Sequence, residues 1–326
     1  MPSTLLCSTG VFEDLSGTGP SKTGNPYDAL IEACHNDSMQ IQARYNIHRT
    51  TRNSQQKTKL LDASFPGVTP DVILQKLENS DIEPEYTDPR NCLVFWARPP
   101  KKIRDLIGEI QKELQEVSPN LWLMPLQNLH MTTLEIAYSR TLQEIQDLVD
   151  VMGLRVSIIT DYTFSHRARL VKPMLSYDDA AIALSFLPAA DEASGSKRLL
   201  GDDDYTYHHL RRDLYDLSQG AGVTIESRYT IPSSHLTIGR FTNATDFSLV
   251  ARGSESLIPD PEKMKLWVEK IEHINQWLQD EYWPSGGETP TKEGGEWIVG
   301  EEKGLDCRVG ALWYGGGETI RLGQGF

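Results

Sequence analysis

The sequence predicts an α+β fold in which one set of helices and strands occurs twice. Residues 101–117 and 261–283 carry apolar side chains at steps of three and four, which is the period of one helix face. Apolar runs of strand length, such as residues 91–99 and 235–241, lie between the helical segments. The order of helix, proline-containing extended segment, His-x-Thr strand, helix and strand pair recurs in the second half. We therefore expect an internal duplication.

The first ninety residues are predicted to be partly helical. A helix is expected over residues 25–43, with Pro26 near its start, where helices tolerate proline. A second, short helix is expected to begin at Thr69 or Asp71. Residues 48–59, with the sequence HRTTRNSQQKTK, are rich in polar side chains, and we expect them to form an exposed connector.

The elements expected after residue 90 follow from apolar periodicity and turn residues. In the first half they are a strand at 91–99, helices at 101–117 and 140–152, an extended segment at 121–138 broken by Pro125, and strands at 167–178 and 180–188. In the second half they are helices at 204–219 and 261–283, an extended segment at 223–242, and strands at 307–315 and 318–324 joined by a glycine-rich turn.

Composition narrows the class of protein. With 39% hydrophobic and 24% charged residues, the chain is expected to be a soluble globular protein. Its net charge of −14 disfavours a long nucleic-acid groove, which needs a basic track, but leaves room for a pocket that binds one or two phosphates. No apolar run approaches the roughly 20 residues that cross a bilayer, and the first residues lack the features of a secretory signal. We expect a cytoplasmic protein, or a nuclear one, with no membrane association.

Neither the cysteines nor the adjacent histidines predict a metal site. The four cysteines are far apart and form no CxxC pair, so we expect reduced thiols; they are Cys7, Cys34, Cys92 and Cys307. His208 and His209 follow three aspartates, but adjacent side chains on a helix point about 100° apart. A solvated helix start with carboxylates at its N-terminal end is therefore expected there.

One short motif occurs once in each half of the duplicated region. The copies are His130-Met131-Thr132 and His235-Leu236-Thr237. In an extended segment the histidine and threonine lie on one face, while the apolar residue between them points to the other. A third match, at residues 48–50, lacks apolar neighbours and is assigned to the connector. Roughly one His-x-Ser/Thr match is expected by chance in a chain with this many histidines. The evidence for a functional motif is therefore that two copies with apolar neighbours occupy equivalent places in the two halves.

Two such pairs facing one pocket have a definite chemistry. One imidazole can act as general base and the other as general acid, because an unperturbed histidine titrates near pH 6.5. The two threonine hydroxyls can donate hydrogen bonds to the oxygens of a tetrahedral anion. A cyclic phosphate could then be opened by water, with one histidine taking a proton and the other protonating the leaving oxygen. The reaction needs neither a metal nor another cofactor.

On these motifs the sequence resembles the two-histidine (2H) phosphoesterase superfamily, whose mark is a duplicated His-x-Thr/Ser motif with hydrophobic neighbours. The resemblance covers residues 91–326 and is especially close to fungal-type cyclic phosphodiesterase or RNA-ligase-like proteins. It implies a bilobal α+β fold in which two antiparallel sheets, with helices outside, form a central cleft. It also implies lobe halves of roughly 91–200 and 201–326, with the option of exchanged strands, and an N-terminal extension over 1–90. Residues 1–90 and an acidic insertion at 191–204 have no counterpart in the family core. We expect them to serve as lids or as surfaces for partners.

The resemblance implies four site residues, with His130 and His235 catalytic and Thr132 and Thr237 binding phosphate. The implied substrates are 2′,3′-cyclic phosphates of nucleotides or of short RNA ends, and the acidic balance favours a small substrate. Further candidate substrate contacts are the cations Lys172 and Arg240 and the base-stacking aromatic residues Tyr229, Trp313 and Tyr314. Arg169 and Arg228 are weaker candidates for a phosphate contact. The alternative for all these cations is a surface position, and the alternative for the aromatic residues is packing in the core.

Other functions stay open at this stage. The same site could support a ligase-like or lyase activity, or bind nucleotides without turnover. The cleft could also serve a non-phosphate metabolite in an isomerase, lyase or hydrolase, which a pocket without cations near the four motif residues would favour. Two intact histidines and threonines favour an enzyme, because a purely binding role would not need both pairs.

Overall fold

The computed structural model describes residues 13–193, 201–250, 257–284 and 289–326. The helices within these ranges are α1 (Asp28–Ala33), α2 (Ser38–Leu60), α3 (Val72–Glu78), α4 (Lys101–Gln115), α5 (Leu142–Met152), α6 (Arg155–Thr160), α7 (Tyr207–Gly220) and α8 (Pro261–Tyr282). The strands are β1 (Asn91–Ala97), β2 (Trp122–Leu123), β3 (Met131–Arg140), β4 (Arg169–Tyr177), β5 (Ala181–Pro188), β6 (His235–Arg240), β7 (Ser248–Val250), β8 (Leu257–Pro259), β9 (Trp297–Ile298), β10 (Lys303–Ala311) and β11 (Glu318–Gln324).

The predicted α+β fold is confirmed. Among the described residues, nine strands form one curled antiparallel sheet in the order β11-β10-β1-β3-β6-β5-β4-β9, with β2 paired to β6. A second, small sheet consists of β7 and β8. Strands β10 and β11, from the end of the chain, pair with β1, so the last strands complete the sheet of the first half.

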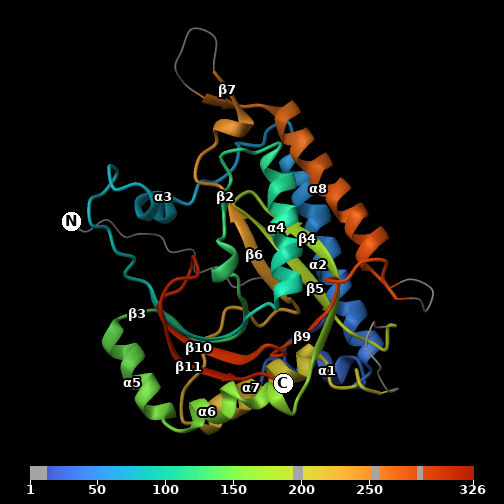
Figure 1. The fold of residues 1–326 in the computed structure, drawn as a ribbon, viewed down its shortest axis with the longest axis vertical. Helices are drawn as coiled ribbons and strands as arrows, with labels where there is room; N and C mark the ends of the chain where they lie inside the picture. Colours follow the sequence, from blue (N-terminus) through green and yellow to red (C-terminus); the bar gives the residue numbers. More distant parts are fainter. Residues whose placement is uncertain (1–12, 194–200, 251–256, 285–288) are drawn as a thin grey trace.

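Helices cover the outside of the sheet in two groups (Figure 1). Helices α5, α6 and α7 pack along β1, β3, β10 and β11, while α2, α4 and α8 pack along β4, β5 and β6. The apolar stripe predicted for residues 101–117 faces the main core, with Ile103, Ile107 and Ile110 fully buried. The stripe of α8 is buried in the same way through Trp267 and Ile271. Periodicity therefore predicted both the helices and their buried faces.

The expected polar connector at residues 48–59 was wrong. These residues form the second half of α2, a helix of 23 residues whose N-cap is Asp37. Their polar side chains contact the sheet: Arg49 donates to the carbonyl oxygen of Lys172 at 2.7 Å, and Asn53 donates to that of Leu175 at 2.8 Å. His48, which belongs to the third His-x-Thr match, is buried on this helix. Long-range hydrogen bonds therefore hold this polar helix against the sheet.

The expected solvated helix start at His208 and His209 was also wrong, because both side chains are buried. Nδ1 of His208 lies 2.9 Å from the hydroxyl oxygen of Tyr45, and its Nε2 lies 2.9 Å from the carbonyl oxygen of Tyr27. His209 caps its own helix through Thr206 and lies 2.7 Å from the side-chain oxygen of Asn36. The pair thus ties α7 to the N-terminal helices. The described residues contain no group of side chains that could hold a metal ion.

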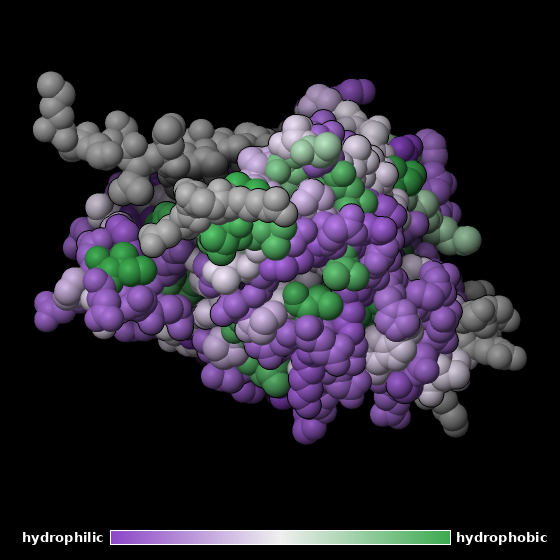
Figure 2. All heavy atoms as spheres, turned by 90° about the horizontal axis from the view of Figure 1, so that it is seen from above, coloured by the Kyte–Doolittle hydropathy of each residue, from purple (hydrophilic) through white to green (hydrophobic). Residues whose placement is uncertain are grey.

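Seen from the end that carries the β7–β8 hairpin, the surface is mainly hydrophilic, with apolar residues in separate patches (Figure 2). Exposed apolar side chains of the hairpin are Leu249, Val250, Leu257 and Ile258. Among the described helices, none is long and apolar enough to cross a membrane. Cys34, Cys92 and Cys307 are buried free thiols, whereas Cys7 and part of the acidic segment 191–204 lie outside the described residues.

We predict that His208→Ala lowers the free energy of unfolding by about 1–3 kcal/mol, because it leaves the Tyr45 hydroxyl and the Tyr27 carbonyl without their partner. Urea unfolding followed by circular dichroism measures the change. His273→Ala, at an exposed position of α8, is the matched control and should stay within about 0.5 kcal/mol of the parent. Equal stabilities of the two variants would contradict a structural role for His208.

Candidate active site

The two His-x-Thr motifs meet where the halves of the sheet join. Strands β3 and β6 pair antiparallel through one residue from each, Met131 opposite Leu236. Both of these side chains are buried in the main core. Because side chains alternate along a strand, the flanking histidines and threonines of both motifs lie on the opposite face. Extending the register by one residue sets His130 across from Thr237 and Thr132 across from His235.

Each motif is followed by a β-bulge at the same position. Against its partner strand, β3 has one extra residue at Thr133, and β6 has one extra residue at Ile238. Each bulge carbonyl accepts a hydrogen bond from a helix side chain: Arg211 of α7 donates to Thr133 at 3.2 Å, and Gln111 of α4 donates to Ile238 at 3.0 Å. A bulge shifts the alternation of side chains by one residue and re-aims those that follow.

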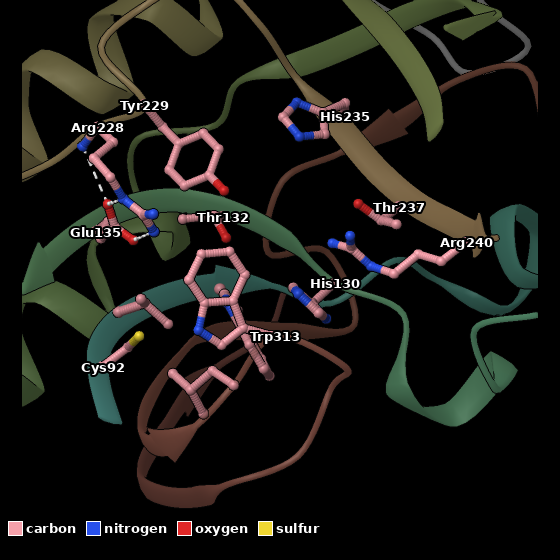
Figure 3. Close-up of a pocket in the computed structure, with 13 residues that line it drawn as sticks. Cys92, His130, Thr132, Glu135, Arg228, Tyr229, His235, Thr237, Arg240 and Trp313 are labelled. Carbon is pink, nitrogen blue, oxygen red and sulfur yellow. Dashed lines mark hydrogen bonds and ion pairs between the residues drawn. The ribbon is translucent and has the colours of Figure 1, made fainter. Parts of the chain in front are cut away.

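The bulges return the fifth residue after each histidine to the cleft. That residue is Glu135 in β3 and Arg240 in β6, and both line the same cleft as the motifs. Equivalent positions of the two halves therefore carry opposite charges. Figure 3 shows them apart from each other, with Glu135 beside Arg228 and Arg240 beside Thr237. The two motif strands share one pattern, but the two ends of the cleft are chemically different.

His130 is held by its neighbours on two sides. Its Nδ1 lies 2.8 Å from the carbonyl oxygen of Asn128, which can only accept, so Nδ1 carries the proton of the neutral ring. The other nitrogen, Nε2, then holds a lone pair. Trp96 stacks on the imidazole with ring centroids 3.7 Å apart. The turn after β10 packs against this segment at Gly315, where a side-chain Cβ would come within 2.5 Å of the Asn128 Cβ.

His235 begins β6 and is oriented by a hydroxyl. Its Nδ1 lies 2.9 Å from Ser233 Oγ, a group that can accept or donate, so either neutral tautomer and the imidazolium are accommodated. The Tyr229 ring lies beside it, with centroids 6.2 Å apart. The carbonyl of Tyr229 accepts a hydrogen bond from the buried Arg211, which fixes the segment that leads to His235.

Burial and nearby arginines keep both imidazoles neutral. Burial lowers the pKa of His130 to about 3, and the positive charges of Arg98 and Arg308 add to the effect against the Asn128 carbonyl. Burial likewise lowers the pKa of His235 to about 4, with further contributions from arginines that include Arg240. The same positive field favours a bound anion. The histidines would be easier to protonate once a negative group lies between them.

The cleft is lined by the four motif residues and by side chains of β1, β3, β6 and two loops. The lining residues are Cys92, Val94, Trp96, His130, Thr132, Glu135, Arg228, Tyr229, His235, Thr237, Arg240, Leu312 and Trp313. Of the further contacts expected from the sequence, Tyr229, Arg240 and Trp313 lie on this cleft. Tyr314 is not among the lining residues: its ring centroid lies 5.6 Å from the Arg240 guanidinium carbon, and its hydroxyl donates to Asp71 at 2.7 Å.

Lys172 is not brought to the cleft. Its ammonium group lies 2.6 Å from Glu192 and 3.0 Å from Gln42, in a separate hollow. Arg169 is buried and bonded to Asp203 and Glu296. Both residues are therefore engaged elsewhere in the fold. The candidate substrate contact at Lys172 is corrected on this ground.

Sequence reasoning missed Trp96 and Glu135. The apolar run of β1 gives no sign that Trp96 faces a cleft, since its neighbours are equally apolar. A signal for Glu135 does exist in the sequence, because Glu135 and Arg240 are each the fifth residue after a motif histidine. Simple alternation places an odd offset on the wrong face, and only the bulges reveal the correspondence.

No family model and no curated protein matches the sequence. Solved structures with similarity to the chain include ATU0111 of Agrobacterium tumefaciens, a conserved protein of unknown function, which is 14% identical with a TM-score of 0.42 over 69% of this chain and 87% of its own. TT0787 of Thermus thermophilus is 14% identical with a TM-score of 0.37, over 71% and 96%. LigT of E. coli complexed with 3′-AMP is 10% identical with a TM-score of 0.33, over 72% and 97%. Similarity at this level does not establish the function of the present chain.

We predict that the imidazole C–H signals of His130 and His235 titrate well below pH 6.5 in the free protein, near 3 and 4, and at higher pH when a nucleoside 3′-monophosphate is bound. The sign follows because an anion favours the charged imidazolium. Proton NMR titration measures both pKa values, and His208, buried outside the cleft with a pKa of about 3, is the control that the ligand leaves unchanged. Ordinary histidine pKa values that are insensitive to ligand would contradict this electrostatic description.

Proposed function

We propose that this protein is a phosphodiesterase that hydrolyses 2′,3′-cyclic phosphates of nucleotides or short RNA ends. The observation that carries the proposal is the pairing of Met131 with Leu236, because it sets two His-x-Thr motifs on one face of one cleft. Each histidine has its Nδ1 engaged by a neighbour, at Asn128 and at Ser233. Each Nε2 is therefore the nitrogen available to a substrate. We also propose that the protein is of the fungal type of cyclic phosphodiesterase.

The proposed reaction is an in-line attack of water on phosphorus. His130, with its lone pair on Nε2, takes a proton from water as the new P–O bond forms. His235, as the imidazolium, gives a proton to the ribose oxygen as the old P–O bond breaks. The product is a phosphate monoester. His130 has gained a proton and His235 has lost one, and proton exchange with solvent restores the starting state. Thr132 and Thr237 donate hydrogen bonds to the non-bridging oxygens.

The charges of the cleft support a phosphate as substrate. Arg240 lies beside Thr237 (Figure 3), and its Nε is buried with no hydrogen-bond partner among the residues described. Its other contact is a long one, 3.5 Å from Nη1 to Asp71. A pocket without cations near the motif residues would favour a non-phosphate metabolite. Arg240 is a cation with an unused donor next to these residues, so this condition is not met. The proposed chemistry uses protein side chains alone, and a metal requirement is left to experiment.

Nucleotide binding without turnover is a second candidate, favoured by one observation. At neutral pH, pKa values of about 3 and 4 leave both imidazoles of the free protein uncharged, so the general acid is absent until an anion binds. If the bound phosphate does not raise the pKa of His235 enough, the cleft binds nucleotides and does not turn them over. Activity therefore has to be measured together with binding.

We predict turnover of 2′,3′-cyclic nucleotides in the presence of EDTA, with kcat reduced roughly 10²- to 10⁴-fold in His130→Ala and in His235→Ala. Thr132→Val and Thr237→Val each remove one donor to the phosphate and should cost up to about 10²- to 10³-fold. Phosphorus-31 NMR follows the reaction and shows whether the product is the 2′- or the 3′-phosphate. His273→Ala is the matched control.

Loss of turnover in EDTA, restored by a divalent cation, would contradict the two-histidine mechanism, as would a fully active His235→Ala. Saturable nucleotide binding without turnover would instead support the binding function. Neither binding nor turnover of any cyclic nucleotide would exclude both.

A further inference from the structure

One end of the cleft forms a compartment with an apolar floor. Cys92, Val94 and Leu312 are each 4% exposed and belong to a small hydrophobic cluster, with Trp96, that is separate from the main core. All four residues line the cleft. Sites that hold flat organic ligands are mostly apolar, with a few well-placed polar groups. This compartment has such groups in Glu135, Arg228 and Trp313.

Arg228 is fixed in the compartment with one end of its guanidinium unused. Glu135 accepts hydrogen bonds from its backbone nitrogen at 3.1 Å, from Nε at 3.2 Å and from Nη2 at 2.7 Å. The guanidinium carbon lies 3.9 Å from the Tyr138 ring centre and 4.8 Å from that of Trp313. Its remaining nitrogen, Nη1, makes no hydrogen bond to a residue that the structure describes. Three hydrogen bonds from one arginine occupy the carboxylate, so this pair presents donors to the cleft.

Trp313 supplies a second donor without a partner. Its indole Nε1 is buried and makes no hydrogen bond within the described part of the chain. A buried N–H group without a partner costs free energy and is uncommon in a native fold. A ligand acceptor at this place would satisfy it. Figure 3 shows Trp313 at the front of the cleft, on the same side as Arg228 and Glu135.

The compartment lies at the right distance from the catalytic residues to receive a base. Glu135 follows Thr132 by three residues, and Thr133 between them is the extra residue of the bulge, so Glu135 lies roughly 10 Å or less along the strand. A phosphate held between the two motifs attaches to the ribose of a nucleotide, and the base projects from that ribose. Arg240 is at the opposite end (Figure 3), so the two ends of the cleft are distinct for a bound nucleotide.

We propose that Arg228 and Trp313 read the base of the substrate and select guanine, an inference that rests on the proposed function of the cleft. Guanine presents two adjacent acceptors, N7 and O6, on one edge, whereas adenine presents an acceptor and a donor there. Two donors without acceptors on one side of the cleft suit an edge with two acceptors, as in guanine, and would set a donor against the amino group of adenine. Glu135 is a positioning residue that holds the guanidinium through its Nε and Nη2.

The first test compares kcat/KM for guanosine and adenosine 2′,3′-cyclic phosphates. The expected ratio is roughly 5- to 100-fold in favour of guanosine. Arg228→Lys keeps a positive charge for Glu135 but removes the guanidinium fork, and the ratio should fall towards one. Trp313→Phe keeps an aromatic ring but removes the N–H, and it should lower the ratio on its own if Arg228→Lys does not fold.

Arg90→Lys is the matched control. The Arg90 guanidinium also lies over the Trp313 ring, at 4.5 Å, but it is bonded to Asp88 and does not line the cleft. This variant should keep the parental guanosine-to-adenosine ratio. An adenosine preference in the parent protein, or a ratio that neither Arg228→Lys nor Trp313→Phe changes, would overturn the proposal.

A binding experiment separates this inference from the proposed hydrolysis. Calorimetry with 3′-GMP and 3′-AMP reports base selection without any turnover. Tighter binding of 3′-GMP that is lost in Arg228→Lys supports base reading even if no cyclic nucleotide is hydrolysed. Hydrolysis of all four cyclic nucleotides at equal kcat/KM, with equal binding of 3′-GMP and 3′-AMP, would overturn base reading and leave the phosphodiesterase intact.

Discussion

The pairing of Met131 with Leu236 is the contact on which the candidate site depends. It is the point where β3 of one half of the sheet meets β6 of the other. Because the two apolar side chains point into the core, the four polar residues that flank them face the cleft together. Burial of the apolar pair thus fixes the register, and a shift of either strand by one residue would turn its motif away from the cleft.

The matched bulges at Thr133 and Ile238 place chemically different residues at the two ends of the cleft. Helix side chains, Arg211 on one side and Gln111 on the other, satisfy the bulge carbonyls in the same manner. The residues that the bulges re-aim have opposite charges, Glu135 and Arg240. A symmetric cleft would accept a nucleotide in two orientations. Under our proposal the base lies towards Arg228 and the phosphate between the histidines, and the different ends would then admit a single orientation.

Local charge, and not net charge, sets the chemistry of the cleft. The chain carries a net charge of −14, yet arginines from several elements surround the two histidines and help to keep their pKa values low. Burying the two imidazoles in the empty site costs little free energy, because they stay neutral. An anionic ligand would reverse the balance by pairing with the arginines and stabilising the imidazolium that acid catalysis needs.

Strong periodicity and one duplicated motif made much of this fold predictable. The helices at 101–117 and 261–283 and the equivalent positions of His130 and His235 were legible, because each depends on neighbours in the sequence. The second half of α2 was not, since Arg49 and Asn53 hold it to carbonyl oxygens of β4 more than a hundred residues away.

The same reason hid His208, the ion pair of Glu135 with Arg228, and the return of β10 to β1. Each of these joins segments that only the tertiary fold brings together. The two bulges shift alternation by one residue, and no local pattern announces them.

A crystal structure with a bound nucleoside 3′-monophosphate would test the central claim most directly. If the two motifs form one site, a single phosphate lies within hydrogen-bonding distance of Nε2 of His130 and of His235, and of both threonine hydroxyls. A phosphate bound by one motif alone, or outside the cleft, would contradict this account.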